Sequence, residues 1–216
     1  MNEVFTVEQL RPMKDGMTIS RDARLGSENR VTFFSLGKDT SISQECYDST
    51  AVYIGASGEA TFLIEEDARK EPFTKGDLVI VPGGTLCGME TSSGAVYTEI
   101  IIKKENTMNS LIKSGKVMKL KDLISYEEGS IANLDVVSNS TMKFMLMAFD
   151  EGTGLTPHRA PGNAIVFALE GQATIGYEGK EYTLSAGENF RFDKNGLHSV
   201  TANGPFKMAL LLVLEE

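Results

Sequence analysis

The chain has 216 residues and a formal net charge of −9, with 41% hydrophobic and 24% charged residues, as in an ordinary globular protein. An acidic surface repels phosphate backbones, so we expect no nucleic-acid partner, and no apolar run approaches the roughly 20 residues that span a bilayer. The start of the chain lacks the basic and apolar segments of a secretion signal. Its two cysteines, Cys46 and Cys87, form no Cys-x-x-Cys pair, which fits free thiols in a reducing compartment. We therefore predict a cytoplasmic protein that contacts neither nucleic acid nor membrane.

Short apolar runs rich in aromatic and branched residues recur along the chain, with Gly, Pro, Asn and Asp between them. Runs of this length and spacing predict an all-β sandwich or barrel. In chain order we predict a short helix at 6–10, strands at 30–36, 61–64, 77–81 and 97–102, a second helix at 119–123, and strands at 142–149, 173–177 and 208–214. The polar stretch 104–115 lacks periodicity and predicts a linker between two domains, 1–103 and 116–216.

The two halves of the chain resemble each other. Residues 4–16 match residues 117–129 without a gap, at an offset of 113 positions. From Gly76, which corresponds to Gly187, the offset is 111, so that Cys87 corresponds to His198. A two-residue length change in one loop explains the shift, because loops absorb such changes at little cost. A constant offset over so many positions predicts an internal duplication.

Glycines, a proline and both histidines of the chain stand at the spacing of two motifs, Gly-x5-His-x-His-x3/4-Glu-x6-Gly and Gly-x5-Pro-x-Gly-x2-His-x3-Asn. These positions are Gly152, His158, Gly171, Gly187 and His198 in the second half, and Gly58, Gly76, Pro82 and Gly84 in the first. The chain thus resembles a tandem two-domain member of the cupin superfamily, a bicupin. Residues 157–192 are similar to small bacterial conserved-barrel cupins of uncertain function. The resemblance implies two jelly-roll barrels of the double-stranded β-helix type, each with a short N-terminal helix.

The same resemblance identifies the places where metal-binding cupins hold one divalent ion with three histidines and a glutamate. The second half keeps His158 and His198, whereas Ala160 and Ala164 occupy the other two places. The first half has lost all four, and has Glu45, Tyr47, Ala51 and Cys87 there. This pattern implies a metal site of His158 and His198 alone, with zinc, iron, nickel or manganese as candidate ions, and no metal in the first barrel.

Because side chains alternate between the two faces of a strand, the positions of the second half that correspond to metal ligands predict a pocket. His158 and Ala160 point to one side of their strand, and Ala164 and Val166 line the facing strand. Two imidazoles then converge on a wall of small apolar side chains. We predict ligand-binding roles for His158, His198, Ala160, Ala164 and Val166, and for Asn163, which with Thr156 or a substrate group could complete a metal shell. The sequence identifies no catalytic residue.

Three functions stay open on these observations. The first is a module that binds a small polar or anionic molecule between His158 and His198, with a mainly structural first barrel. The second is a metal-dependent isomerase, lyase or oxygenase in the second barrel. The third is a structural protein without a specific ligand. In the first barrel, Cys87 is expected to be a packing residue, since no histidine is available there as a base. The cupin resemblance also implies a homodimer.

Overall fold

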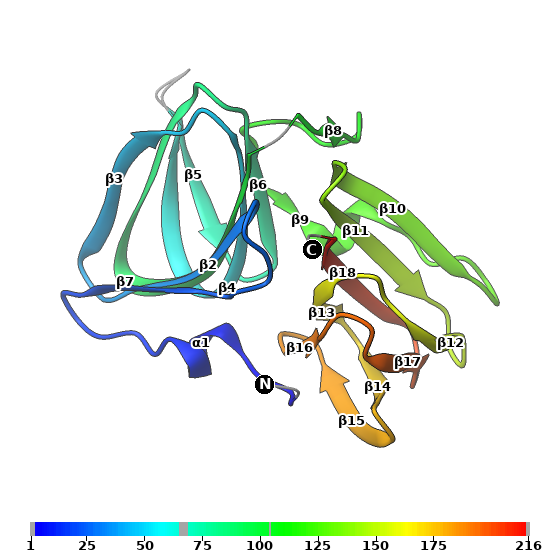
Figure 1. Ribbon diagram of the computed structural model, residues 1–216. Coiled ribbons are helices and arrows are strands. Elements are labelled where there is room, and N and C mark those ends of the chain that lie inside the picture. The colour runs from blue at the N-terminus through cyan, green and yellow to red at the C-terminus, as the bar shows by residue number, and fades with distance from the viewer. Residues whose placement is uncertain (1–2, 65–68, 104, 215–216) are drawn as a thin grey trace. The chain divides into compact units, whose positions relative to one another are not determined.

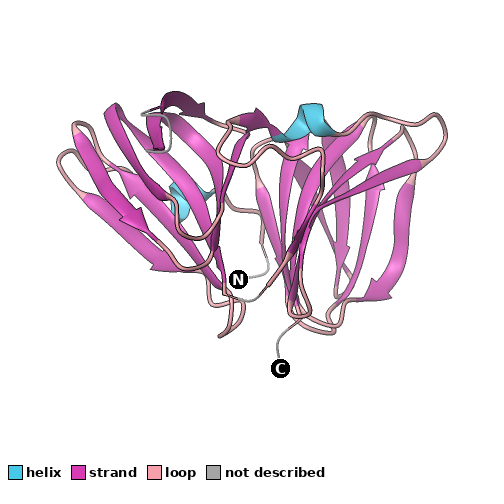
Figure 2. Cartoon of the chain, turned by 90° about the horizontal axis from the view of Figure 1, so that it is seen from above, coloured by secondary structure: helices cyan, strands magenta, loops and turns pink. Residues whose placement is uncertain are grey.

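The computed structural model describes residues 3–64, 69–103 and 105–214. Strands make up most of the chain and helical segments are short, as the prediction of an all-β protein requires (Figures 1 and 2). Contacts divide the chain into two compact units. The N-terminal unit consists of Val7–Glu105 and Ser110–Lys119, and the C-terminal unit consists of Asn106–Asn109, the chain from Leu120 onward, and the segment that ends at Thr6. In the described residues, no helix is long and apolar enough to cross a membrane.

The N-terminal unit holds one sheet that is built around a long strand, β7. In chain order its elements are α1 (Val7–Leu10), β1 (Thr18–Asp22), β2 (Arg30–Leu36), β3 (Thr40–Cys46), β4 (Thr50–Ile64), β5 (Arg69–Thr74), β6 (Asp77–Val81), β7 (Leu86–Ile102) and β9 (Met118–Lys119). The path β1-β2-β7-β4-β6-β9 carries β3 on β7 and β5 on β4. Along one edge of β7, its N-terminal part pairs with β3 and its C-terminal part pairs with β2. The other edge of β7 pairs with β4 over nearly its whole length.

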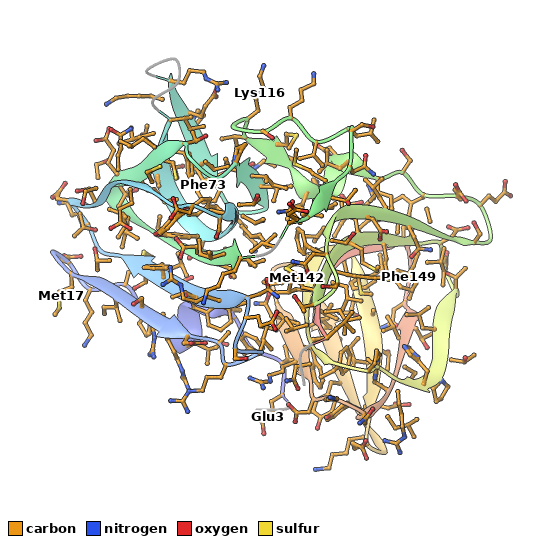
Figure 3. The ribbon with its side chains drawn as sticks, turned by 45° about the horizontal axis from the view of Figure 1, so that its top comes forward. Glu3, Met17, Phe73, Lys116, Met142 and Phe149 are labelled. Atoms are coloured by element: carbon orange, nitrogen blue, oxygen red, sulfur yellow. The ribbon has the colours of Figure 1, made fainter. Side chains whose placement is uncertain are left out.

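The C-terminal unit has two sheets that face each other across a core. Its elements are β8 (Thr107–Met108), the 3-10 helix η2 (Leu120–Leu123), β10 (Ile131–Ser138), β11 (Met142–Phe149), β12 (Gly154–Arg159), β13 (Asn163–Glu170), β14 (Gln172–Tyr177), β15 (Lys180–Ser185), β16 (Asn189–Phe192), β17 (Leu197–Ala202) and β18 (Phe206–Val213). One sheet has the order β16-β13-β18-β11-β10-β8, and the other has the order β12-β17-β14-β15. Phe149 belongs to this core and Phe73 to that of the other unit (Figure 3).

The predicted elements agree with the structure. The strands predicted at 30–36, 77–81 and 142–149 coincide with β2, β6 and β11, and the other predicted strands lie within or overlap longer ones. The first helix begins one residue later than predicted, and the second is a single 3-10 turn. Alternation explains this success, because each run places one set of side chains in a core and the other outside it.

The internal duplication is visible in the strand pairing. Phe34 of β2 faces Tyr97 of β7, and Met147 of β11 faces Met208 of β18, which are the same pair at offsets of 113 and 111. Gly58 and Gly171, the closing glycines of the first motif, both adopt positive φ, 71° and 73°. A Cβ atom on either one would lie 2.2 or 2.1 Å from a backbone carbonyl oxygen, so both positions require glycine.

The segment at the start of each repeat pairs with the other repeat. Phe5 forms a bridge with Asn189 of the C-terminal unit, whereas Met118 pairs with Leu78 of the N-terminal unit. These are equivalent pairs, since Met118 corresponds to Phe5 and Asn189 to Leu78. Lys119, next to Met118, forms an ion pair of 2.7 Å with Asp77, which holds strand β9 against β6. Each unit is therefore completed by residues from the far side of the predicted domain boundaries.

Candidate functional site

The two histidines of the chain meet in the C-terminal unit. His158 on β12 and His198 on β17 are direct partners in the antiparallel ladder, next to a register shift between Leu155 and His158. Their ring centroids lie 4.2 Å apart with an interplanar angle of 54°. The two histidines, which are 40 positions apart in the chain, therefore lie side by side, as the motif spacing predicted.

Each imidazole is oriented by a carbonyl oxygen two residues before it. The Nδ1 atom of His158 lies 2.8 Å from the Thr156 oxygen, and the Nδ1 atom of His198 lies 2.9 Å from the Gly196 oxygen. A carbonyl oxygen only accepts hydrogen bonds, so in both rings Nδ1 must carry the proton. In the neutral tautomer that results, both Nε2 atoms keep a lone pair that can accept a hydrogen bond or bind a metal.

The two rings differ in their surroundings. His198 is only 7% exposed and stacks on Phe192 with a centroid distance of 4.1 Å, whereas His158 is exposed. Burial lowers the pKa of His198, the hydrogen bond to Gly196 opposes this in part, and the neighbouring His158 adds to the lowering. The pair thus combines a fixed inner imidazole, which stays neutral near pH 7, with an outer imidazole open to solvent.

The other predicted site residues fall into two groups. Ala164 and Val166 are almost fully buried in the same core as Phe192. Ala160 and Asn163 instead hold the turn that leads into β17: the Ala160 carbonyl accepts from the Asn195 N–H, and the Asn163 Oδ1 atom accepts from the Lys194 N–H at 2.9 Å. Their contact with a ligand stays a prediction.

An open depression of about 260 Å³ borders the buried histidine. It is lined by Pro157, Gly176, Tyr177, Glu178, Gly179, Lys180, Glu181, Leu197, His198 and Ser199. A small ligand could enter here with one side against His198 and the polar residues of the β14–β15 turn around it. Its size lies near the lower limit of ordinary small-molecule sites.

The two histidines are too few side chains for an ordinary metal site. Within the part of the chain that the structure describes, no group of three or more His, Cys, Asp or Glu side chains is arranged to hold one. His158 and His198 supply two ligands, where proteins ordinarily supply three or four. The side chains present therefore do not make a complete metal site on their own, and further ligands would have to come from water or substrate.

The equivalent place in the N-terminal unit holds a different chemistry. Glu45 and Cys87 are ladder partners, as His158 and His198 are. With Tyr47 they line one small cavity, and the lining of this cavity also includes Tyr53 and Glu99. Burial raises the pKa of the Cys87 thiol, so it stays protonated and serves as a packing residue beside the Tyr53 hydroxyl, 3.4 Å away. Glu99 was missed by the sequence analysis, although a charge in an otherwise apolar strand is a visible signal.

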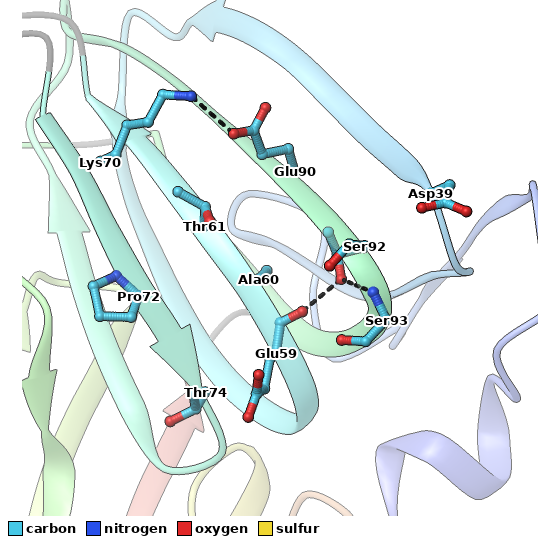
Figure 4. Close-up of a pocket in the computed structure, with 11 residues that line it drawn as sticks. Asp39, Glu59, Ala60, Thr61, Lys70, Pro72, Thr74, Glu90, Ser92 and Ser93 are labelled. Atoms are coloured by element: carbon cyan, nitrogen blue, oxygen red, sulfur yellow. Dashed lines mark hydrogen bonds and ion pairs between the residues drawn. The ribbon is translucent and has the colours of Figure 1, made fainter.

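A larger groove of about 660 Å³ lies on the outside of the N-terminal unit (Figure 4). Two of its four charged side chains, Lys70 and Glu90, pair with each other at 3.0 Å, and the other two are the carboxylates of Asp39 and Glu59. The Thr91 hydroxyl donates to the Glu59 carbonyl and accepts from the Gly94 N–H. Because the lysine, its partner glutamate and the threonine hydroxyl are satisfied within the groove, they do not converge on a ligand, and we place no site there.

Comparisons with known proteins agree with this architecture. Residues 145–214 match the family described as the cupin domain. The structure is similar to the cupin 2 conserved barrel domain protein from Leptotrichia buccalis, with a TM-score of 0.83 and 24% identity over 98% of this chain and 96% of that one. It is also similar to a salicylate 1,2-dioxygenase from Pseudaminobacter salicylatoxidans, with a TM-score of 0.68 and 11% identity over 99% of this chain and 84% of that one.

No curated protein matches the chain. Identities of this size establish a shared fold and carry no reaction with them. The family match, the two motif histidines side by side on β12 and β17, and the repeated strand pairing nevertheless agree on one conclusion. Residues 145–214 match the cupin domain family, and the chain as a whole has the two-unit β fold of the solved cupin structures to which it is similar.

Proposed function

We propose that this protein binds a small polar molecule at the paired imidazoles of His158 and His198. The observation that carries the proposal is the orientation of the two rings, whose Nδ1 atoms are each engaged by a backbone carbonyl. Two Nε2 acceptors are thereby presented 40 positions apart in sequence and side by side in space. Acceptors of this kind recognise the hydroxyl donors of a small polar molecule.

The surroundings of the two rings also support this proposal, because they limit the directions from which a ligand can approach. Phe192 and the core behind it close the inner side of His198, so a ligand approaches from the exposed side of His158 or from the neighbouring depression. Ala160 and Asn163 act on this arrangement through the turn before β17. We assign the N-terminal unit a mainly structural role with respect to this ligand.

Replacing both histidines is expected to weaken ligand binding at least about tenfold, because two hydrogen bonds of roughly 1 kcal/mol each are lost. The probes are glucose, which offers hydroxyls, salicylate, which offers a hydroxyl and a carboxylate, and acetate, which offers only a carboxylate. In the parent protein, the histidine ring signals of NMR spectra report binding. The His158→Ala, His198→Ala double variant has no histidine, so binding to it is followed by its amide signals. The exposed Thr201→Ala change on the same strand is the control.

The proposal fails in either of two cases. In one, none of the three probes perturbs a histidine ring signal of the parent protein. In the other, the double variant, shown to be folded by its amide spectrum, binds each probe as tightly as the parent. Preference for glucose and salicylate over acetate would support the hydroxyl-donor reading.

A second candidate is a metal-dependent isomerase, lyase or oxygenase. It is favoured by the same Nδ1–carbonyl hydrogen bonds, which metal-binding histidines use to present Nε2 to an ion. Protein purified without chelators or a polyhistidine tag is then expected to hold stoichiometric zinc, iron, nickel or manganese, and the His158→Ala variant is expected to lose it. Absence of metal in both proteins, even after dialysis against divalent ions, would refute this candidate.

A further inference from the structure

The small cavity of the N-terminal unit contains an isolated cluster of ionisable groups. Its lining comes from β3, β4, β7 and the turn after β3, and includes Glu45, Tyr47, Tyr53, Cys87, Tyr97 and Glu99. The centre of a water-sized sphere can move within about 10 Å³ of this cavity, which is enough space for one group of the size of a water molecule. The cavity is partly open, so that such a group could be the tip of a longer molecule.

Negative charge dominates this cavity. The Tyr47 hydroxyl lies between the two carboxylates, 3.0 Å from Glu45 Oε2 and 3.5 Å from Glu99 Oε2. Glu99 is only 3% exposed, and Arg30 approaches its other oxygen at 3.5 Å with a side chain that is 51% exposed. Both contacts to Glu99 are at the outer limit of a hydrogen bond, so this buried carboxylate is weakly satisfied.

The walls of the cavity also suit a cation. Tyr53 and Tyr97 flank Glu99, with ring centroids 6.1 Å apart, and Phe62 contacts Tyr53 at 4.9 Å. The faces of aromatic rings attract ammonium groups through their negative quadrupole. Carboxylates and aromatic rings therefore line a space of the size of one small cationic group.

These groups are specific to the N-terminal unit. Tyr53 faces Glu99 across β4 and β7, whereas the equivalent pair of the other unit is Val166 facing Leu210 across β13 and β18. A charge in this place is therefore not needed for the fold, since the second copy is stable with two apolar residues there. Buried charge without a structural need is a common mark of a binding site.

We propose that this cavity binds the ammonium group of a small protonated amine. An ammonium ion has three or more N–H donors and the size of a water molecule, and it can donate to Glu99, Glu45 and the Tyr47 oxygen while it lies against the tyrosine rings. Two carboxylates disfavour an anion in the same space. The site is separate from His158 and His198 and independent of the function proposed for them.

Methylammonium chloride is the probe, titrated at pH 8.5 and constant ionic strength with sodium chloride as the reference salt. At this pH the amine is still protonated, since a lysine-type amine has a pKa of about 10.4, and ionisation of Glu99, whose pKa is raised by burial, is favoured. Amide and tyrosine signals of the N-terminal unit are expected to shift with a saturable dependence on methylammonium. The His158→Ala, His198→Ala double variant is expected to bind equally well.

Three substitutions separate this proposal from its alternatives. Glu99→Gln is expected to weaken binding at least tenfold, and Arg30→Gln is expected to strengthen it, because the competing cation is removed. Glu90→Gln is the matched control, since Glu90 lies on the same strand but pairs with Lys70 outside the cavity. If Glu99→Gln does not fold, the exposed Glu45→Gln should still weaken binding at least threefold.

Three results would overturn the proposal. One is a methylammonium titration that shifts no cavity signal beyond the sodium chloride reference. Another is equal affinity in the Glu99→Gln and Glu90→Gln variants. The third is weaker binding in Arg30→Gln together with saturable binding of acetate, which would show an anion site anchored by the guanidinium.

Discussion

Replacing Phe5 by alanine is expected to destabilise the C-terminal unit by about 3–5 kcal/mol, although Phe5 stands near the start of the chain. Its side chain is buried, and its backbone forms two hydrogen bonds with the backbone of Asn189, of 3.0 and 2.7 Å. The side-chain amide nitrogen of Asn189 also donates to the Phe5 carbonyl at 3.2 Å. Truncation leaves a cavity beside β16 and weakens this bridge. Hydrogen exchange measured strand by strand should show lost protection in β13 and β16.

Val7 provides a close control for this prediction. It is as buried as Phe5 and only two positions away, but it belongs to the N-terminal unit. Val7→Ala is expected to cost about 2 kcal/mol and to lower protection in β4 and β7, against which α1 packs. Loss of protection in the same strands for both variants would contradict the exchange of N-terminal segments.

The Phe192→Ala variant is expected to lose about 3–5 kcal/mol of stability and to disturb the histidine pair. Phe192 is almost fully buried and its ring covers the inner face of His198. Removing the ring opens a cavity behind the imidazole and admits water, so desolvation of His198 decreases. The pKa of His198 should therefore rise toward its ordinary value, which an NMR titration of the ring protons measures directly.

Phe206→Ala separates the two effects in this variant. Phe206 is fully buried in the same core and contacts Phe149, with no ring contact to either histidine. We expect a similar loss of stability and an unchanged pKa of His198. An equal change of that pKa in both variants would mean that general loosening of the core, rather than the ring of Phe192, controls the imidazole.

Most of the fold was predictable because it depends on local patterns. The runs at 30–36 and 142–149 alternate so clearly that the predicted strands coincide with β2 and β11. The offset of 113 positions, falling to 111, identified the duplication, and the strand registers of Phe34 with Tyr97 and Met147 with Met208 reproduce it. The pairing of His158 with His198 followed from the spacing of the two motifs.

Two features of the candidate sites were beyond local reasoning. Whether Ala164 and Val166 line a cavity or fill a core depends on which side chains face them, and the phenylalanines of β16 and β18 come from distant parts of the chain. The cluster around Glu99 depends likewise on Tyr47, Tyr53 and Arg30, which three different segments bring to one strand. A charged residue in an apolar strand was the only warning in the sequence.

The sequence alone was enough to predict seven of the strands and the duplication, because side-chain alternation and a constant offset can be recognised within each repeat, and the cupin resemblance added the meeting of the two histidines. Only the tertiary structure decided which unit receives each N-terminal segment. Residues 4–16 and 117–129 have the same pattern in the duplication, so this pattern alone does not distinguish Asn189 from Leu78 as a partner. The choice depends on where the folded chain delivers Phe5 and Met118, which is a property of the whole fold.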